Sequence, residues 1–152
     1  MTANEPSVVH DEAFTVSRTI DISASPEKVW AALTEAEHIA RWFPQEAVLD
    51  DVAVGAGGVF SFDGFGDQAI RIEELDAPRM IAYRWSAGPG PLDADHSTVF
   101  RFTLEPQGEA TRLTVVESGF ETMADPAASM EEHRGGWDSE LDELVAYLEG
   151  GS

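Results

Sequence analysis

Residues 125–148 constrain the fold more than any other stretch, because their pattern predicts one long amphipathic helix. With an advance of about 100° per residue, a single apolar stripe centred on Trp137 takes in Met130, Leu141, Leu144, Val145 and Leu148. Asp125 followed by Pro126 is typical of a helix start, and Gly150 is typical of a helix end. At roughly 1.5 Å per residue the helix is more than about 30 Å long. A one-sided helix of this length needs a large apolar surface to cover.

The chain before this helix is predicted to be mostly β-strand. Apolar and polar residues alternate from Phe14 to Ile22, which indicates a half-buried strand. Ser25-Pro26 opens a short helix, and a second short helix is expected over residues 35–42. Further strands with turn signals between them are expected at 46–52, 58–63, 68–75, 80–86, 97–105 and 111–118, with an exposed loop at 87–96. Consecutive strands with tight turns imply an antiparallel sheet with the terminal helix on its concave face, so the fold class is α+β.

Arg18 interrupts the first strand, because it lies on the side that otherwise carries apolar residues. We expect Arg18 at a margin of the sheet with its charge turned outward; pairing with an internal carboxylate is the alternative. Residues 1–13 are expected to be a loose leader before a single domain over residues 14–149.

The charge balance limits the class of partner. Nine Lys and Arg stand against 29 Asp and Glu, a net charge of −20, whereas nucleic acids and anionic membranes need clustered cations. We therefore expect neither nucleic acid nor membrane as a partner. The chain has no cysteine, no apolar signal core near Met1 and no apolar run long enough to span a membrane, so a cytoplasmic location is expected. Adaptation to high salt also fits the acidic balance and is left open.

Several short segments occur in a recognisable order. They are Ile20–Leu33, Glu37–Trp42, Glu74–Pro78, Trp85, Ser97–Val99, Ser118–Phe120 and Gly136-Trp137 with the leucines after it. In this order they resemble the START-like, helix-grip superfamily, and within it the family named for the activator of the heat-shock chaperone ATPase. The likeness covers about residues 14–149.

The resemblance implies a curved antiparallel sheet of about seven strands wrapped round a long C-terminal helix, with two short helices after the first strand. It also implies a cavity between the helix and the sheet. Related families bind lipids, polyketides or plant hormones there, and some have become cyclases. Family membership of this kind predicts fold better than function.

Three polar residues lie on faces that should be buried: Glu117 in the last strand, and His133 and Arg134 one turn before Trp137. One interpretation is structural, in which Glu117 pairs with Arg134 or Arg18 and closes the end of the core, since a buried charge needs a partner. The other is functional, in which Glu117, His133 and Arg134 orient a ligand in an otherwise apolar pocket.

The large apolar side chains allow the same two interpretations, because each can fill the core or line a cavity. The candidate ligand-binding residues are Trp42, Phe60, Phe62, Tyr83, Trp85, Phe100, Phe102, Phe120, Trp137 and Leu141. Gly135-Gly136 in the long helix costs roughly 1 kcal/mol per residue relative to alanine. This cost indicates close approach by a strand, a kink or an opening at the mouth of the cavity.

The function that these features favour is non-catalytic binding of a small apolar or aromatic molecule. A cyclase- or hydrolase-type enzyme is the alternative, with Glu117 and His133 as the candidate acid–base pair. The third hypothesis is a chaperone-binding module that acts through its outer surface. A homodimer is a further possible partner. No cofactor is expected. No metal site is expected either, because the histidines are far apart in sequence: His10, His38, His96 and His133.

Overall fold

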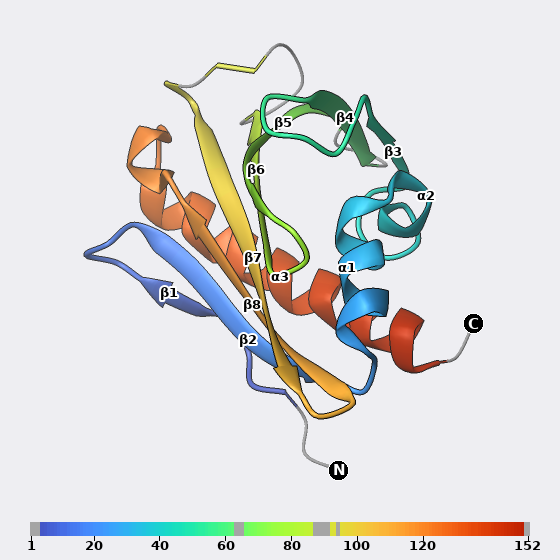
Figure 1. The fold of residues 1–152 in the computed structure, drawn as a ribbon. Coiled ribbons are helices and arrows are strands. Elements are labelled where there is room, and N and C mark those ends of the chain that lie inside the picture. Colours follow the sequence, from blue (N-terminus) through green and yellow to red (C-terminus); the bar gives the residue numbers. More distant parts are fainter. Residues whose placement is uncertain (1–3, 63–65, 87–91, 94, 151–152) are drawn as a thin grey trace.

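A single curved antiparallel sheet forms most of the molecule (Figure 1). The computed structural model describes residues 4–62, 66–86, 92–93 and 95–150. Its eight strands follow the order β1-β2-β8-β7-β6-β5-β4-β3. They are β1 (Val8–His10), β2 (Thr15–Ile22), β3 (Glu46–Leu49), β4 (Gly57–Phe62), β5 (Gly66–Asp76), β6 (Met80–Ser86), β7 (Ser97–Gln107) and β8 (Ala110–Ser118). The α+β helix-grip architecture predicted from the sequence is confirmed. Part of the expected 87–96 loop lies outside the described residues.

The long helix α3 (Pro126–Glu149) crosses one face of this sheet (Figure 1). Its N-cap is Asp125, whose carboxylate accepts a hydrogen bond from the backbone N–H of Ala128. Trp137 is 2% exposed, which confirms the predicted phase of the helix. A 3₁₀ turn, η1 (Phe120–Thr122), connects β8 to the start of α3.

Two short helices, α1 (Pro26–Thr34) and α2 (Ala36–Ile39), close the other end of the core (Figure 1). The Ser25 hydroxyl caps α1 by accepting from the N–H of Lys28. Buried Trp42 donates through Nε1 to the Ala32 carbonyl at 2.8 Å, and buried Tyr83 donates to the Leu33 carbonyl at 2.6 Å. The hydrogen bonds donated by these two side chains therefore link α1 to the residues after α2 and to the sheet.

The N-terminal segment is more ordered than the expected loose leader, because Val8–His10 adds β1 to the edge of the sheet. This is the eighth strand, one more than the resemblance implies. The Ser7 N–H donates to the Asp138 carboxylate of α3 at 2.6 Å.

Arg18 explains why this segment is held. The expectation that Arg18 lies at a sheet margin is wrong, because the residue is 5% exposed and points under α3. Its guanidinium donates to the Glu5 carbonyl, to the Trp137 and Asp138 carbonyls, and to the Asp142 carboxylate. The alternative stated above, pairing with a carboxylate, is observed, but the carboxylate of Asp142 is 67% exposed and only the guanidinium is internal. A buried guanidinium requires acceptors for its five donors.

Candidate functional site

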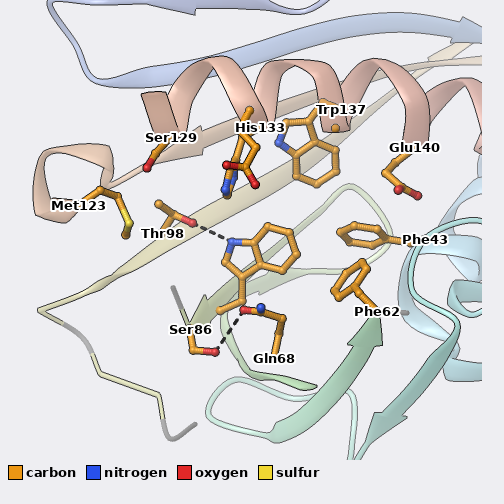
Figure 2. Close-up of a pocket in the computed structure, with 13 residues that line it drawn as sticks. Phe43, Phe62, Gln68, Ser86, Thr98, Met123, Ser129, His133, Trp137 and Glu140 are labelled. Atoms are coloured by element: carbon orange, nitrogen blue, oxygen red, sulfur yellow. Dashed lines mark hydrogen bonds between the residues drawn. The ribbon is translucent and has the colours of Figure 1, made fainter. Parts of the chain in front are cut away.

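A pocket of about 480 Å³ lies between α3 and the sheet. Figure 2 shows His133 and Trp137 reaching from α3 towards the pocket, with Phe43 and Phe62 on the side away from Thr98. Among the described residues, the lining comprises Phe43, Phe62, Gln68, Trp85, Ser86, Thr98, Met123, Ser129, Glu132, His133, Gly136, Trp137 and Glu140. The rings are closely packed: Trp85 and Trp137 are stacked with centroids 6.4 Å apart, and Phe43 lies 5.4 Å from Trp137.

A fully buried carboxylate, Glu117 of β8, lies behind this aromatic wall. Its Oε1 accepts from Trp137 Nε1 at 2.9 Å and contacts His133 Nδ1 at 2.8 Å. Its Oε2 accepts from the Thr98 hydroxyl and from Trp85 Nε1, the latter at 3.0 Å. Each carboxylate oxygen thus meets an indole N–H, a group that can only donate.

This hydrogen bonding fixes Glu117 as the ionised form. Burial alone would raise the pKa of Glu117, but the charge of His133 and the hydrogen bonds from His133, Thr98 and Trp137 outweigh it and lower that pKa. The pKa of His133 shifts in the opposite direction, upwards. Burial would lower the pKa of His133, yet the Glu117 carboxylate, its hydrogen bond and the nearby Glu132 raise it.

His133 is oriented by the ionised carboxylate. Because Glu117 Oε1 can only accept, the proton on the imidazole is held at Nδ1. The His133 ring also packs edge-on against Phe120 and Trp85, with centroids 5.1 and 5.9 Å away. The His133 side chain is 30% exposed and lines the pocket, and its remaining nitrogen is Nε2.

A second titratable group, Glu140, lines the pocket on the other side of Trp137 (Figure 2). Burial, together with the charge of Glu143, raises the pKa of Glu140 to about 7. The two flanks of Trp137 therefore carry a histidine that gains basicity and a carboxyl group that loses acidity.

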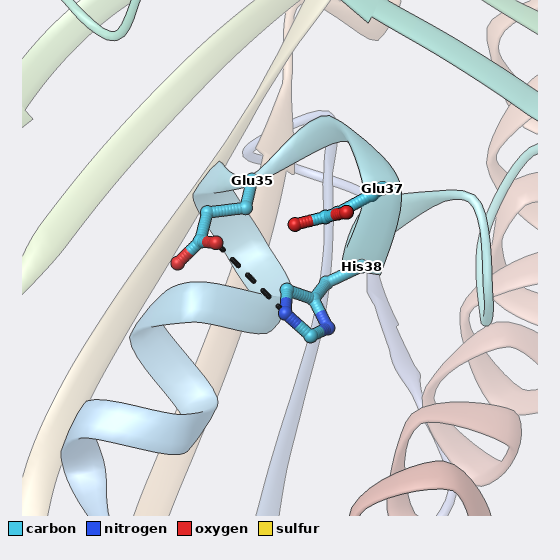
Figure 3. Close-up of side chains that lie close together, drawn as sticks. All are labelled: Glu35, Glu37 and His38. Carbon is cyan, nitrogen blue, oxygen red and sulfur yellow. Dashed lines mark ion pairs between the residues drawn. The ribbon is translucent and has the colours of Figure 1, made fainter.

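Outside the pocket, Glu35, Glu37 and His38 bring their ligand-type atoms within 4.8 Å of one another (Figure 3). Both carboxylates are exposed, and His38 Nδ1 is already hydrogen-bonded to the Tyr147 hydroxyl at 2.7 Å. His38 Nε2 lies 3.8 Å from Glu35 Oε1. Surface ion pairing accounts for this arrangement.

Comparison with known proteins bears on this fold and pocket. The family model of Activator of Hsp90 ATPase homolog 1-like proteins matches residues 23–149. The chain belongs to this family. No curated protein matches it. In the part of the chain that the structure describes, no helix is both long and apolar enough to span a membrane.

Several solved structures are similar to this chain in fold. MLL2253 from Mesorhizobium loti is 28% identical with a TM-score of 0.76, over 91% of this chain and 98% of that chain. DynU16, a protein in the dynemicin biosynthetic locus, is 26% identical with a TM-score of 0.73, over 91% of this chain but only 48% of DynU16. The Aha1 dimer from Colwellia psychrerythraea, at 24% identity, has a TM-score of 0.71 over 91% of this chain and 98% of that chain.

The structure divides the candidate site residues of this family member into three groups. Four line the pocket: Phe62, Trp85, His133 and Trp137. Glu117 lies directly behind that lining. The buried core contains Trp42, Phe60, Tyr83, Phe100, Phe102, Phe120 and Leu141.

The predicted partner of Glu117 is wrong, because neither Arg134 nor Arg18 contacts it; the cationic partner is His133. Arg134 instead pairs with Glu131 and, at 3.3 Å, with Asp138 of its own helix. It does not line the pocket. Arg18 lies opposite Val115, two residues before Glu117 on β8. Its guanidinium therefore contacts α3 at the Asp138 carbonyl, more than one turn after His133.

Some pocket residues were not predicted, although their positions in the sequence indicated them. Thr98 shares the face of Phe100, two residues along β7, and lies opposite Trp85. Glu140 lies one helical turn after Trp137, and Gly136 directly before it. The central position of the Phe43 ring among the pocket aromatics was not predicted. That position depends on how the segment after α2 folds back over the sheet.

Of the explanations for Gly135-Gly136, the structure supports an opening at the pocket. A Cβ added at either glycine would have no heavy atom within 4 Å, so close approach by a strand is excluded. Gly136 lines the pocket and Gly135 does not.

Proposed function

We propose that this protein binds a small aromatic molecule in the pocket between α3 and the sheet and performs no chemistry on it. The observation that carries the proposal is the pocket itself: about 480 Å³, with the rings of Phe43, Phe62, Trp85 and Trp137 in its wall. Sites for small ligands typically have volumes of roughly 300–1,000 Å³ and walls that contain aromatic side chains. Affinity would come from apolar burial at roughly 25 cal/mol per Å², less the cost of association.

Tryptophan fluorescence tests the proposal directly, because Trp85 and Trp137 line the pocket. Titration with a panel of flavonoid-like, polyketide-like and fatty ligands should change the emission, and Trp85→Phe should remove much of that change. Trp30→Phe is the matched control, since Trp30 lies on α1 outside the pocket lining. Silence across the panel, or a response that depends on Trp30 instead, would contradict binding in this pocket and favour a role for the outer surface.

A second candidate is acid–base catalysis on the bound molecule. The observation in its favour is the hydrogen bond of 2.8 Å between His133 and buried Glu117, since an imidazole oriented by a carboxylate can act as a general base. Product analysis of bound ligands by mass spectrometry separates the two proposals. Turnover that Glu117→Gln abolishes while binding persists would establish the enzyme; recovery of every ligand unchanged would support the binder.

A further inference from the structure

Among the polar groups of the pocket, His133 Nε2 belongs to a ring with a fixed orientation. Nδ1 is committed to Glu117, and Nε2 has no hydrogen-bond partner among residues 4–62, 66–86, 92–93 and 95–150. The Thr98 hydroxyl is engaged with Trp85 and Glu117, and Ser86 with Gln68, while Ser129, Glu132 and Glu140 also line the pocket. A bound molecule therefore finds one oriented, unpaired nitrogen next to the Trp85 and Trp137 rings.

The state of Glu117 determines what this nitrogen offers. Above its raised pKa, His133 is a neutral imidazole with its proton held at Nδ1, and Nε2 then presents a lone pair that accepts a hydrogen bond. If a second proton arrives at Nε2, the resulting imidazolium is neutralised by the buried carboxylate 2.8 Å away. The dyad can thus take up a proton without creating an unpaired buried charge.

The charges around the pocket disfavour an anionic ligand. None of the lining residues that the structure describes is Lys or Arg, whereas Glu132 and Glu140 are both among them. Glu117 adds a buried negative charge behind the wall, and the whole chain carries −20. A carboxylic acid or a phosphate would enter as an anion and be repelled by these negative charges. A neutral molecule would not be repelled.

We propose that the ligand presents a neutral aromatic hydroxyl group, of the phenol or naphthol type, which donates its hydrogen bond to His133 Nε2 while its ring packs on Trp85 and Trp137. This inference rests on the proposed function and specifies the chemical class of its ligand. Where the hydroxyl is acidic enough, its proton passes to Nε2. The products are a phenolate oxygen and an imidazolium, and no bond other than O–H and N–H changes.

A pair of probes that differ only at the hydroxyl tests this inference. The hydroxyl of 4-nitrophenol can donate, while 4-nitroanisole carries a methoxy group there and cannot. Binding is followed by quenching of tryptophan emission over a pH range that spans the raised pKa of His133, because only the neutral imidazole can accept the hydrogen bond. We expect the phenol to bind about tenfold more tightly than the ether, as one hydrogen bond in a buried site provides. Its visible absorption should also shift towards the phenolate form on binding.

His133→Asn removes Nε2 while leaving a side-chain amide that can still donate to Glu117. In this variant we expect the two probes to bind with equal affinity and the phenolate band to disappear. His10→Asn is the matched control, because His10 lies on β1 outside the pocket and contacts Ser17. It should keep the wild-type preference.

The outcomes separate this inference from the proposed function. Equal affinity of the two probes for the wild-type protein, or a preference that survives His133→Asn, overturns the hydroxyl inference while binding in the pocket stands. Failure of both probes and of the wider ligand panel overturns the two together. If His133→Asn does not fold, the ratio of affinities and the absorption shift of the wild-type protein still decide the question.

Discussion

At the scale of single residues, the molecule places one buried carboxylate where four donors reach it. Glu117 is 0% exposed, yet Trp137, His133, Thr98 and Trp85 complete its hydrogen bonding. An unpaired carboxylate at this depth would be strongly destabilising, so the donors are a condition for folding as well as a feature of the pocket. All four of these donors also line the pocket that a ligand would enter.

The pKa of His133 should depend on Glu117. In the wild-type protein it lies above the ordinary value of 6.5, so the stability it contributes is complete below 6.5 and is lost as pH rises through the folded-state pKa. In Glu117→Gln, burial remains without the carboxylate, and we expect the pKa of His133 to fall below 6.5. NMR titration of the His133 ring protons measures this. An unchanged pKa would show that Glu117 does not control the imidazole.

Trp137 should contribute through both its ring and its N–H. Trp137→Ala is expected to lower the free energy of unfolding by about 3–5 kcal/mol, because it empties a site that is 2% exposed. Trp137→Phe keeps most of the apolar contact but removes a donor to Glu117, and should cost about 1–3 kcal/mol. Urea unfolding measures both. A loss under about 1 kcal/mol for the alanine variant would be inconsistent with this account.

At the scale of elements, α3 combines three tasks. Leu141 faces the core, His133, Trp137 and Glu140 line the pocket, and Asp138 takes part in the contacts with the N-terminal segment. The sequence of α3 is therefore not optimal for stability alone. Its two glycines, Gly135 and Gly136, lower the stability of the helix.

Gly135 and Gly136 offer a matched pair of substitutions. Alanine at either position meets no atom within 4 Å and should stabilise the helix by roughly 1 kcal/mol. Only Gly136 lines the pocket, so only Gly136→Ala should weaken binding of bulky ligands. Urea unfolding and fluorescence titration of both variants check this. Equal effects of the two substitutions on affinity would show that Gly136 is not part of the entrance.

Glu140 should lower stability as pH rises. Its folded-state pKa of about 7 exceeds the ordinary 4.5, so the folded protein retains a proton that the unfolded chain releases, and stability falls between these values. Glu140→Gln should remove this slope and raise the free energy of unfolding above pH 7 by about 1 kcal/mol, a value reduced for solvent screening. Glu143→Gln should have a smaller effect of the same sign. A steeper slope in Glu140→Gln would refute this assignment.

The sequence predicted the elements well and the side-chain partners less well. Alternation and helical period placed β2 and α3 and the burial of Trp137 and Glu117, because these depend on which face a residue occupies. The partner of Glu117 depends on how far α3 is shifted along the sheet, and no periodicity records that shift. His133 and Arg134 differ by about 100° around the helix, which decides which of them meets Glu117. A three-residue strand such as β1 is likewise too short to show a period.

At the scale of the whole molecule, acidity dominates the surface. Seven arginines make ion pairs with carboxylates: Arg18, Arg71, Arg79, Arg84, Arg101, Arg112 and Arg134. Even so, 29 acidic residues against nine basic ones leave a net charge of −20. Self-repulsion of this kind destabilises the compact state, and salt screens it.

We therefore expect the urea midpoint of unfolding to rise with sodium chloride concentration. Exposed ion pairs weaken in salt, but each contributes little, so screening of the net repulsion should prevail. Unfolding curves at low salt and at about 0.5 M, where the Debye length falls to a few Å, make the comparison. A midpoint that falls with salt would show that the ion pairs outweigh the repulsion.

The hydrogen bonds of Glu117 divide the pocket into a fixed half and an interchangeable half. Trp85, Thr98, His133 and Trp137 cannot change without leaving a buried charge short of donors. Phe43, Phe62 and Gln68 come from other segments and make no contact with that charge. Ligand selectivity can therefore diversify through the second half while the first supplies a constant anchor. Randomising residues 62 and 68 should yield many folded variants, and randomising residues 98 and 137 should yield few.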